Sequence, residues 1–180
     1  EMYSQYLHYQ PGQKEISIPD KEPVSGIGDS DEEKTIAFES NGMRYSFGDN
    51  QVQLLKNVKV TMIRKPKPAK PNKGEDAASE SDAKPKKKVE DKTTIYSDYA
   101  LIERNKQVSH FTMYPERPIE TRFVRIEQPD TFVRSRRADL HYGDSSDLLQ
   151  YMTAYDDVFI REFSEGKEIR YATCGLADFD

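Results

Sequence analysis

The sequence predicts an all-β protein made of repeated β-hairpins, with little or no helix. Three observations support this fold class. Polar and apolar residues alternate over several stretches, which is typical of strands with one buried face. Two hairpin-like units each occur twice along the chain. No stretch combines apolar residues three and four positions apart with the capping residues of a helix.

The strongest strand signal lies between Asn50 and Met62. Apolar residues share one parity there, interrupted only by Lys56, and polar residues fill the other parity apart from Leu55. This period of two predicts one strand, or two strands joined near Lys56-Asn57, with one buried face. The turn residues Gly48-Asp49-Asn50 precede it. The buried parity contains Val52, Leu54, Val58, Val60 and Met62.

A second turn is predicted at Asn41-Gly42, between a strand over residues 35–39 and another over residues 43–47. Asn-Gly is a strong hairpin signal because both residues tolerate positive φ. Residues 35–47 are therefore expected to form a hairpin of their own.

The repeats involve two units. Tyr3-Ser4-Gln5-Tyr6 returns as Tyr96-Ser97-Asp98-Tyr99. Residues 43–49 return as residues 138–144, and both copies run on into a Leu-Leu pair and a short alternating strand. A third unit begins at Tyr171. Each unit has the pattern of a hairpin that cannot bury its apolar face alone, so stacked hairpins are expected to share one core.

One segment departs from this pattern. Residues 64–92 are rich in Lys, Pro, Ala and acidic residues, lack aromatic residues, and have Val89 as their only larger aliphatic residue. Such a composition cannot bury enough apolar surface to offset the entropy of ordering. We therefore expect a flexible insertion at residues 64–92. It separates a first set of β repeats at residues 1–63 from a second set at residues 93–180, which is truncated at its C-terminal end.

The repeats resemble the OstA-type repeat. Residues 41–45, 52–54 and 57–60 carry the first match, residues 137–142 with 157–160 are similar to a second copy, and residues 177–180 to the opening of another. This repeat belongs to the periplasmic bridge proteins of lipopolysaccharide export, of the LptA and LptC type. The resemblance implies an open, twisted β-jelly roll, similar to a slotted barrel. In that family the apolar interior carries acyl chains and the ends pair edge to edge with like domains.

The same resemblance implies a role in outer-membrane biogenesis in the cell envelope. The expected location is the periplasm. The expected partners are lipopolysaccharide or lipid A and, through edge strands, other OstA-type transport proteins. Because the chain begins at Glu1 without an initiator Met, we expect a fragment or a processed form. Two types of bridge protein fit this expectation: a soluble one, and one anchored in the inner membrane by a segment outside this fragment. The anchored type is favoured.

The apolar stripe has two interpretations. In one, it fills the closed core of a ligand-free scaffold or adaptor protein. In the other, which the resemblance favours, the layers splay and the stripe lines a groove for acyl chains. Residue spacing does not separate the two. The candidate lipid-binding residues are Ile16, Ile18, Ile36, Phe38, Val52, Leu54, Val58, Val60, Phe111, Met113, Val158 and Ile160.

Arg134, Arg136 and Arg137, with Arg122 and Arg125 upstream of them, form a basic cluster that is a candidate for a second contact, with the phosphates of a lipid head group. A guanidinium group can bind a phosphate bidentately, which suits this task. The alternative is an exposed strand face on which these arginines pair with Glu120 and Glu127.

Several function classes lack support. A net charge of −5 argues against a general nucleic-acid binder. The histidines are scattered without metal-ligand spacing, and Cys174 is a lone cysteine with no neighbouring cation. Nucleotide-binding and hydrolase motifs are absent. We therefore expect no enzyme, cofactor or metal site. A glycan hydrolase stays as a third alternative, because carboxylates are plentiful, and would need two of them in one cleft.

Overall fold

The structure is a computed structural model that describes residues 1–31, 34–64, 91–143 and 146–179. These residues form thirteen strands and two single-turn 3₁₀ segments, Arg104–Lys106 and Ile119–Thr121. The predicted all-β fold class is confirmed. In chain order the strands are β1 (Met2–Ser4), β2 (His8–Gln10), β3 (Glu15–Asp31), β4 (Lys34–Ser46), β5 (Gln51–Arg64), β6 (Asp91–Ser97), β7 (Tyr99–Glu103), β8 (Val108–Thr112), β9 (Val124–Glu127), β10 (Thr131–Ser135), β11 (Arg137–Gly143), β12 (Ser146–Ser164) and β13 (Lys167–Phe179).

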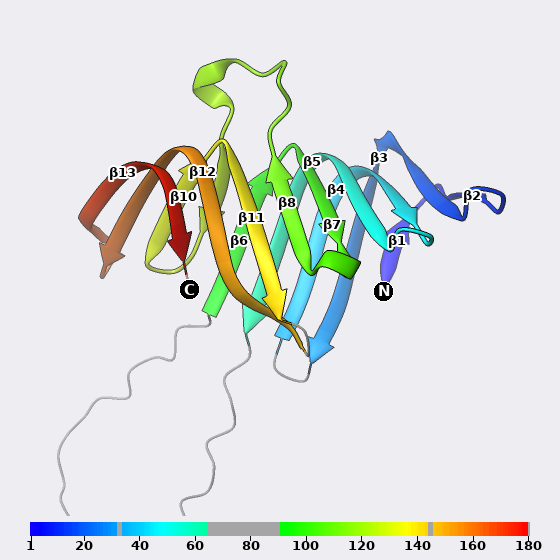
Figure 1. Cartoon of the computed structure of the whole chain (residues 1–180), viewed down its shortest axis with the longest axis horizontal. Helices are drawn as coiled ribbons and strands as arrows, with labels where there is room; N and C mark the ends of the chain where they lie inside the picture. The colour runs from blue at the N-terminus through cyan, green and yellow to red at the C-terminus, as the bar shows by residue number, and fades with distance from the viewer. Residues whose placement is uncertain (32–33, 65–90, 144–145, 180) are drawn as a thin grey trace, which may run out of the picture.

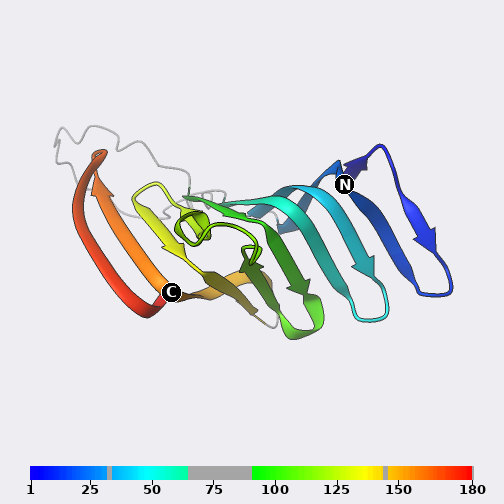
Figure 2. The same ribbon diagram turned by 90° about the horizontal axis from the view of Figure 1, so that it is seen from above.

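The strands form one antiparallel sheet that folds into two layers (Figure 1, Figure 2). Strand β5 belongs to both layers, because its residues 51–54 pair with β7 and its residues 58–64 pair with β6. Strand β12 likewise pairs with β11 through residues 146–155 and with β10 through residues 159–162. We call the layer of β7, β8 and β11 the first layer and the layer of β6, β9 and β10 the second layer. The result is the predicted jelly-roll-like fold.

The long strands bend where they cross between the layers. In β3 the pairing with β4 shifts register between Ile18 and Pro23, so that extra residues bulge out of the ladder. In β5 the bend falls at Asn57, which has a φ of 51°. In β12 it falls at Asp156 and Asp157, with φ of 58° and 51°. Bulges and positive φ angles are devices that turn a strand sharply while its pairing continues on both sides.

A serine marks four other bends, in or just after β1, β4, β6 and β10. The hydroxyls of Ser4, Ser40, Ser97 and Ser135 each donate a hydrogen bond to the carbonyl oxygen two residues further on, over 2.9–3.1 Å. Such a bond satisfies a carbonyl that the bend removes from the ladder. The repeated Tyr-Ser-x-Tyr motif thus has a structural meaning, because each of its serines ends one strand just before the chain turns into the next: Ser4 ends β1 and Ser97 ends β6.

The predicted hairpin turn at Asn41-Gly42 is wrong. Strand β4 continues through both residues and pairs with β3 and β5 on either side of them. Only Gly42 has a positive φ, of 77°, whereas the common two-residue hairpin turn that Asn-Gly favours needs two such residues. Gly42 instead allows a bend, and partner strands on both sides outweigh the local preference for a turn.

The predicted strand over residues 50–62 is confirmed as β5, which runs from Gln51 to Arg64 and bends near the predicted junction. The turn before it also lies where it was predicted, at residues 47–50. On the inner face Leu54, Val58 and Val60 are buried. The alternation of apolar and polar residues therefore assigns the correct face to the interior.

Arg64, Asp91 and Lys92, which the prediction placed in the insertion, lie in strands β5 and β6. Residues 65–90 lie outside the described residues, so its expected flexibility stays a prediction. Arg64 belongs to β5 and pairs with Asp91 of β6, and Ile63 pairs with Lys92. Backbone pairing needs no apolar side chain, so the ladder extends beyond the point where apolar alternation stops.

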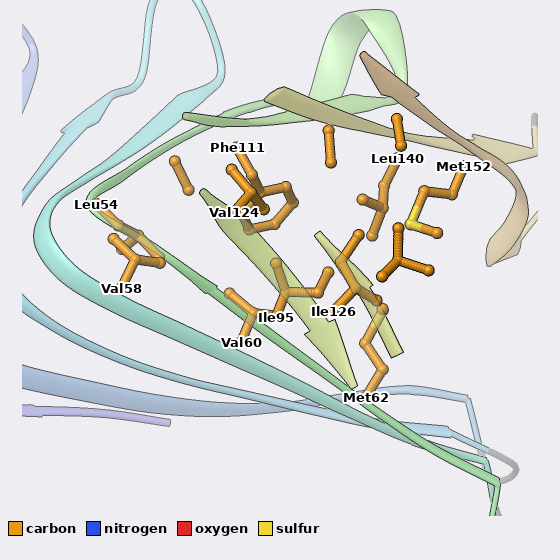
Figure 3. Packing of buried hydrophobic residues seen from close by; sticks show 14 of the residues in the cluster. Leu54, Val58, Val60, Met62, Ile95, Phe111, Val124, Ile126, Leu140 and Met152 are labelled. Carbon is orange, nitrogen blue, oxygen red and sulfur yellow. The ribbon is translucent and has the colours of Figure 1, made fainter. Parts of the chain in front are cut away.

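The core lies between the two layers (Figure 3). Both inner faces contribute: Leu54, Val58 and Val60 come from β5, while Phe111 of β8 and Ile126 of β9 come from strands that lie only in one layer. Side chains on the opposite parity of each strand form the outer faces. The molecule thus has one shared apolar interior and two outer surfaces, and each is a separate place to search for function.

Candidate functional site

The interior collects nearly all of the predicted lipid-binding residues. Six are buried and five more are half-buried against the same cluster. Ile16 is half-buried and lies outside this cluster, in β3 opposite Tyr9 and Tyr45. The buried six are Ile18, Leu54, Val58, Val60, Phe111 and Val158, and the half-buried five are Ile36, Phe38, Val52, Met113 and Ile160.

The interior is a packed core at its centre. Leu54, Ile95 and Leu140 have 0% of their surface exposed, so no solvent-sized space adjoins them. Protein interiors of this kind are as dense as organic crystals, and an acyl chain could enter only if the layers separated or side chains moved. The half-buried residues at the margins are therefore the first that a ligand would meet.

Several core residues were missed from the sequence because their strands are short. Val124 and Ile126 lie in the four-residue β9, and Ile95 follows two threonines in β6. Two apolar residues of one parity are too few to stand out from chance alternation. Their burial follows from the pairing of β9 with β6 and β10, which spacing along the chain does not reveal.

Apolar side chains are exposed at both ends of the sheet. At the N-terminal end Tyr3 and Tyr6 are exposed, and the exposed rings of Tyr9 and Phe47 meet edge to face with centroids 6.3 Å apart. At the other end Ile169 and Tyr171 of β13 are exposed. Apolar residues at the ends of a sheet are suited to contact with another protein.

Of the three predicted head-group arginines, Arg134 and Arg136 lie against the same ring, 4.7 and 4.2 Å from the centre of Phe123, whereas Arg137 lies against another. Arg136 is engaged within the fold: its Nε donates to Asp157 over 2.9 Å, and its Nη1 donates to the Ile119 carbonyl over 2.6 Å. Arg137 pairs with Asp139, 3.3 Å away, and its guanidinium lies 4.1 Å from the centre of the Tyr155 ring. Arg134 is different, because it lies on the outer face of the second layer without a carboxylate partner among the described residues.

The outer face of the first layer carries a polar network around His110. The Nδ1 atom of this histidine lies 2.9 Å from Asp139, and its Nε2 atom lies 3.3 Å from Glu103. Glu103 also accepts a hydrogen bond from Lys106 over 2.9 Å. Lys106, and then His110, lower the pKa of Glu103, although its burial opposes them. Both carboxylates are thus engaged within the sheet, through Lys106 and His110.

The described residues offer no group of three or more His, Cys, Asp or Glu side chains that could hold a metal ion. His141 stacks on Tyr151 with ring centroids 4.3 Å apart. Cys174 is exposed on β13. In the same part of the chain no helix is long and apolar enough to cross a membrane.

A scan against family models and a search of curated proteins found no match. The crystal structure of LptH, the LptA-homologous periplasmic component of the lipopolysaccharide transport device of Pseudomonas aeruginosa, is similar with a TM-score of 0.45 and 9% identity. The alignment covers 78% of this chain and 74% of that chain. Similarity of this size gives no basis for a function, which must come from the residues themselves.

Proposed function

We propose that this chain is a periplasmic bridge domain of lipopolysaccharide export, which joins like domains through its sheet edges and accommodates acyl chains in its apolar interior. The OstA-type repeat pattern motivates the proposal. The observation that carries it is a single jelly-roll-like sheet, with an apolar interior running between edge strands at its two ends. Other OstA-type transport proteins are the proposed partners, and anchoring by a segment outside residues 1–180 stays part of the proposal.

The edges support the assembly step. Strand β13 pairs with β12 alone among the described strands, and at the other end β1 and β2 pair only with β3. Residues 167–176 of β13 are exposed throughout. An edge strand presents unpaired N–H and C=O groups, to which a strand of another domain can add. The exposed Tyr171 and Ile169 would supply apolar contacts to such a strand.

Proline substitutions in β13 test this assembly. Successive residues of an edge strand direct their N–H groups alternately toward the neighbouring strand and toward the free edge. Ala172→Pro and Thr173→Pro each remove one of these N–H groups. The variant that loses the N–H facing the free edge should weaken self-association, or binding to an OstA-type domain, at least about tenfold. Its melting temperature should change little, because no hydrogen bond within the protein is lost. The other should lower the melting temperature, because it removes a donor to β12.

Analytical ultracentrifugation measures the association and circular dichroism the melting. The two variants are matched controls for each other, since both introduce proline into the same strand. A protein that stays monomeric at high concentration and binds no OstA-type domain contradicts the assembly step.

Photo-crosslinking at the margins of the interior tests whether acyl chains enter it. An aromatic photo-crosslinker should replace Phe38 or Phe179 with little strain, because both rings are half-buried against the core. We expect both positions to capture lipopolysaccharide or lipid A, since acyl chains that enter between the layers pass these rings. Each buried methylene contributes about 0.8 kcal/mol, so even a short inserted segment supports reversible binding.

Tyr151 provides the matched control for the crosslinker. It is aromatic, 38% exposed, and next to the inward-facing Met152, so it lies on the outer face. Equal capture at Tyr151 and Phe38 would indicate adhesion to the surface. Failure of a well-folded protein to capture lipid at either inner position would contradict the ligand step.

A ligand-free scaffold is the second candidate, and the fully buried centre of the core favours it. In that case the edges assemble but the interior stays closed. Edge pairing without lipid capture would therefore select the scaffold, whereas both together would select the bridge.

A further inference from the structure

A hollow lies mainly on the outer face of the second layer, and next to the bend of β5 it also reaches Val58 and Met113 of the apolar interior. Its volume is about 730 Å³. That lies within the range of about 300–1,000 Å³ typical of small-molecule sites. One wall comes from the loop of residues 113–123, which joins β8 to β9 (Figure 1). The remaining walls come from outward side chains of β5, β6, β9, β10 and β12, chiefly Lys59, Tyr96, Arg125, Phe132, Arg134 and Phe159.

The strand registers place these side chains in one cross-strand row. Lys59 stands opposite Tyr96, and Tyr96 opposite Arg125. Arg125 stands directly opposite Arg134, which in turn stands opposite Phe159. Like charges at directly opposed positions repel each other and destabilise a sheet. The centre of the row is therefore a place where two positive charges face each other without an evident structural benefit.

Most other charges of the hollow are already paired. Lys59 lies 3.0 Å from Glu39, Arg117 lies 2.5 Å from Asp98, and Arg161 lies 3.4 Å from Glu168. Glu120, on the loop, is the remaining carboxylate of the lining. Among the described residues, the guanidinium groups of Arg125 and Arg134 have no carboxylate or hydrogen-bond partner and contact only aromatic rings. The hollow thus has a local excess of positive charge, although the whole chain has a net charge of −5.

Aromatic rings hold the two free guanidinium groups in place. Arg125 lies 4.9 Å from the centre of the Tyr96 ring. Arg134 lies 4.7 Å from the centre of Phe123 and 4.9 Å from that of Phe159. A guanidinium group over a ring keeps its N–H donors in its own plane, free to bind an anion. Its planar fork loses less conformational entropy on binding than a lysine would.

The loop that forms the wall is fixed to the sheet. The buried Asp98 accepts a hydrogen bond from the Tyr114 backbone N–H over 3.0 Å as well as the ion pair with Arg117. The Tyr114 hydroxyl donates to the Leu55 carbonyl, and Arg136 donates to the Ile119 carbonyl over 2.6 Å. Phe123 and Met113 at the ends of the loop are half-buried. The hollow therefore exists before any ligand arrives.

We propose that this hollow binds a phosphate group, carried by a small molecule or by a lipid head group, between Arg125 and Arg134. A phosphate can carry two negative charges and presents several acceptor oxygens, so it neutralises both guanidinium groups and can hydrogen-bond to both at once. The space beside Phe132 and Met113 then takes the molecule that carries the phosphate. Arg125 and Arg134 point away from the acyl-chain interior. Because inorganic phosphate carries no acyl chain, its binding tests this site separately from that proposal.

Calorimetric titration with inorganic phosphate and with glucose 1-phosphate tests the site in the whole chain, at low ionic strength and with sodium acetate for comparison. We expect phosphate binding that acetate does not reproduce. Arg125→Gln and Arg134→Gln should each weaken it about tenfold or more, because each removes charge-assisted hydrogen bonds. Arg170→Gln is the matched control, since Arg170 is exposed, pairs with Glu162 and does not line the hollow. Both test arginines are exposed, and circular dichroism checks that their variants fold.

Flotation with vesicles of phosphatidylcholine, with or without phosphatidic acid, distinguishes the source of the phosphate. Binding of the soluble phosphates identifies a small-molecule site. Binding only to vesicles with phosphatidic acid, lost in Arg125→Gln and Arg134→Gln but kept in Arg170→Gln, identifies a lipid head group. No binding in any arm overturns the proposal, as does binding that acetate matches or that the three variants weaken equally.

Discussion

Val60→Asp is expected to lower the free energy of unfolding by several kcal/mol. Val60 is 6% exposed on the inner face of β5, where its cross-strand neighbours are Phe38 and Ile95. A carboxyl group there has no partner. Burying an unpaired neutral polar group costs about 2–7 kcal/mol, and keeping the carboxylate ionised would cost more. The loss of valine contacts adds to this cost. Urea unfolding followed by circular dichroism measures the change.

Lys59→Asp is the control for this substitution, because it introduces the same side chain one position away on the outer face. It breaks the ion pair between Lys59 and Glu39, whose side chains are 39% and 63% exposed. Exposed pairs of this kind contribute about 0–1 kcal/mol. Equal destabilisation by the two variants would mean that the wrong face of β5 has been assigned to the interior.

Strand β5 shows what the sequence could predict. Its alternation is long enough to stand out from chance, its turn residues precede it, and the break at Lys56-Asn57 coincides with the bend between layers. Each of these signals is local, because one strand period or one turn is contained in a few neighbouring residues. The all-β fold class follows from the same local information.

The bend at Gly42 shows what could not be predicted. The local preference of Asn-Gly for a turn competes with pairing to β3 and β5, and those partners are distant in the sequence. The serines at the bends were missed for a similar reason. A single serine is common in loops and strands alike, and only the four equivalent places in the fold give Ser4, Ser40, Ser97 and Ser135 a shared role.

The candidate sites divide in the same way. The apolar parity predicted which residues face inward, but the same residues would line a closed core or an open groove, since side-chain type does not specify the distance between layers. Arg134 was a head-group candidate from the sequence, and Arg125 was placed only upstream of the same basic cluster, with no prediction that the two face each other. Their direct opposition depends on the register between β9 and β10, which no spacing along the chain specifies.

Gly42→Ala is expected to destabilise the fold strongly. Its φ of 77° disfavours any residue with a Cβ atom. A Cβ atom at this position would lie 2.5 Å from the Cα and 2.9 Å from the backbone nitrogen of Asp20, in the bulge of β3. That bulge is also held from the other side, because Asp20 reaches across to Lys56 of β5 in a 2.6 Å ion pair. Lys56 accordingly lowers the pKa of the Asp20 carboxyl.

The backbone of β3 must therefore move for an alanine to fit at position 42. Unfavourable φ costs roughly 1–2 kcal/mol and overpacking about 1–3 kcal/mol, so we expect a loss of about 2–5 kcal/mol in the free energy of unfolding. Gly166→Ala separates the two contributions. Gly166 has the same φ of 77°, but a Cβ atom there would have no neighbour within 4 Å. Its replacement should lose only the φ contribution.

Gly12→Ala completes the series, because Gly12 has neither a positive φ nor a neighbour within 4 Å, and its replacement should leave stability nearly unchanged. Urea unfolding of the three variants gives the order Gly42, Gly166, Gly12 from most to least destabilised. Equal losses at Gly42 and Gly166 would mean that the β3 bulge moves aside freely. In that case the positive φ of Gly42 alone would account for the bend in β4, and the close approach of β3 would contribute nothing to it.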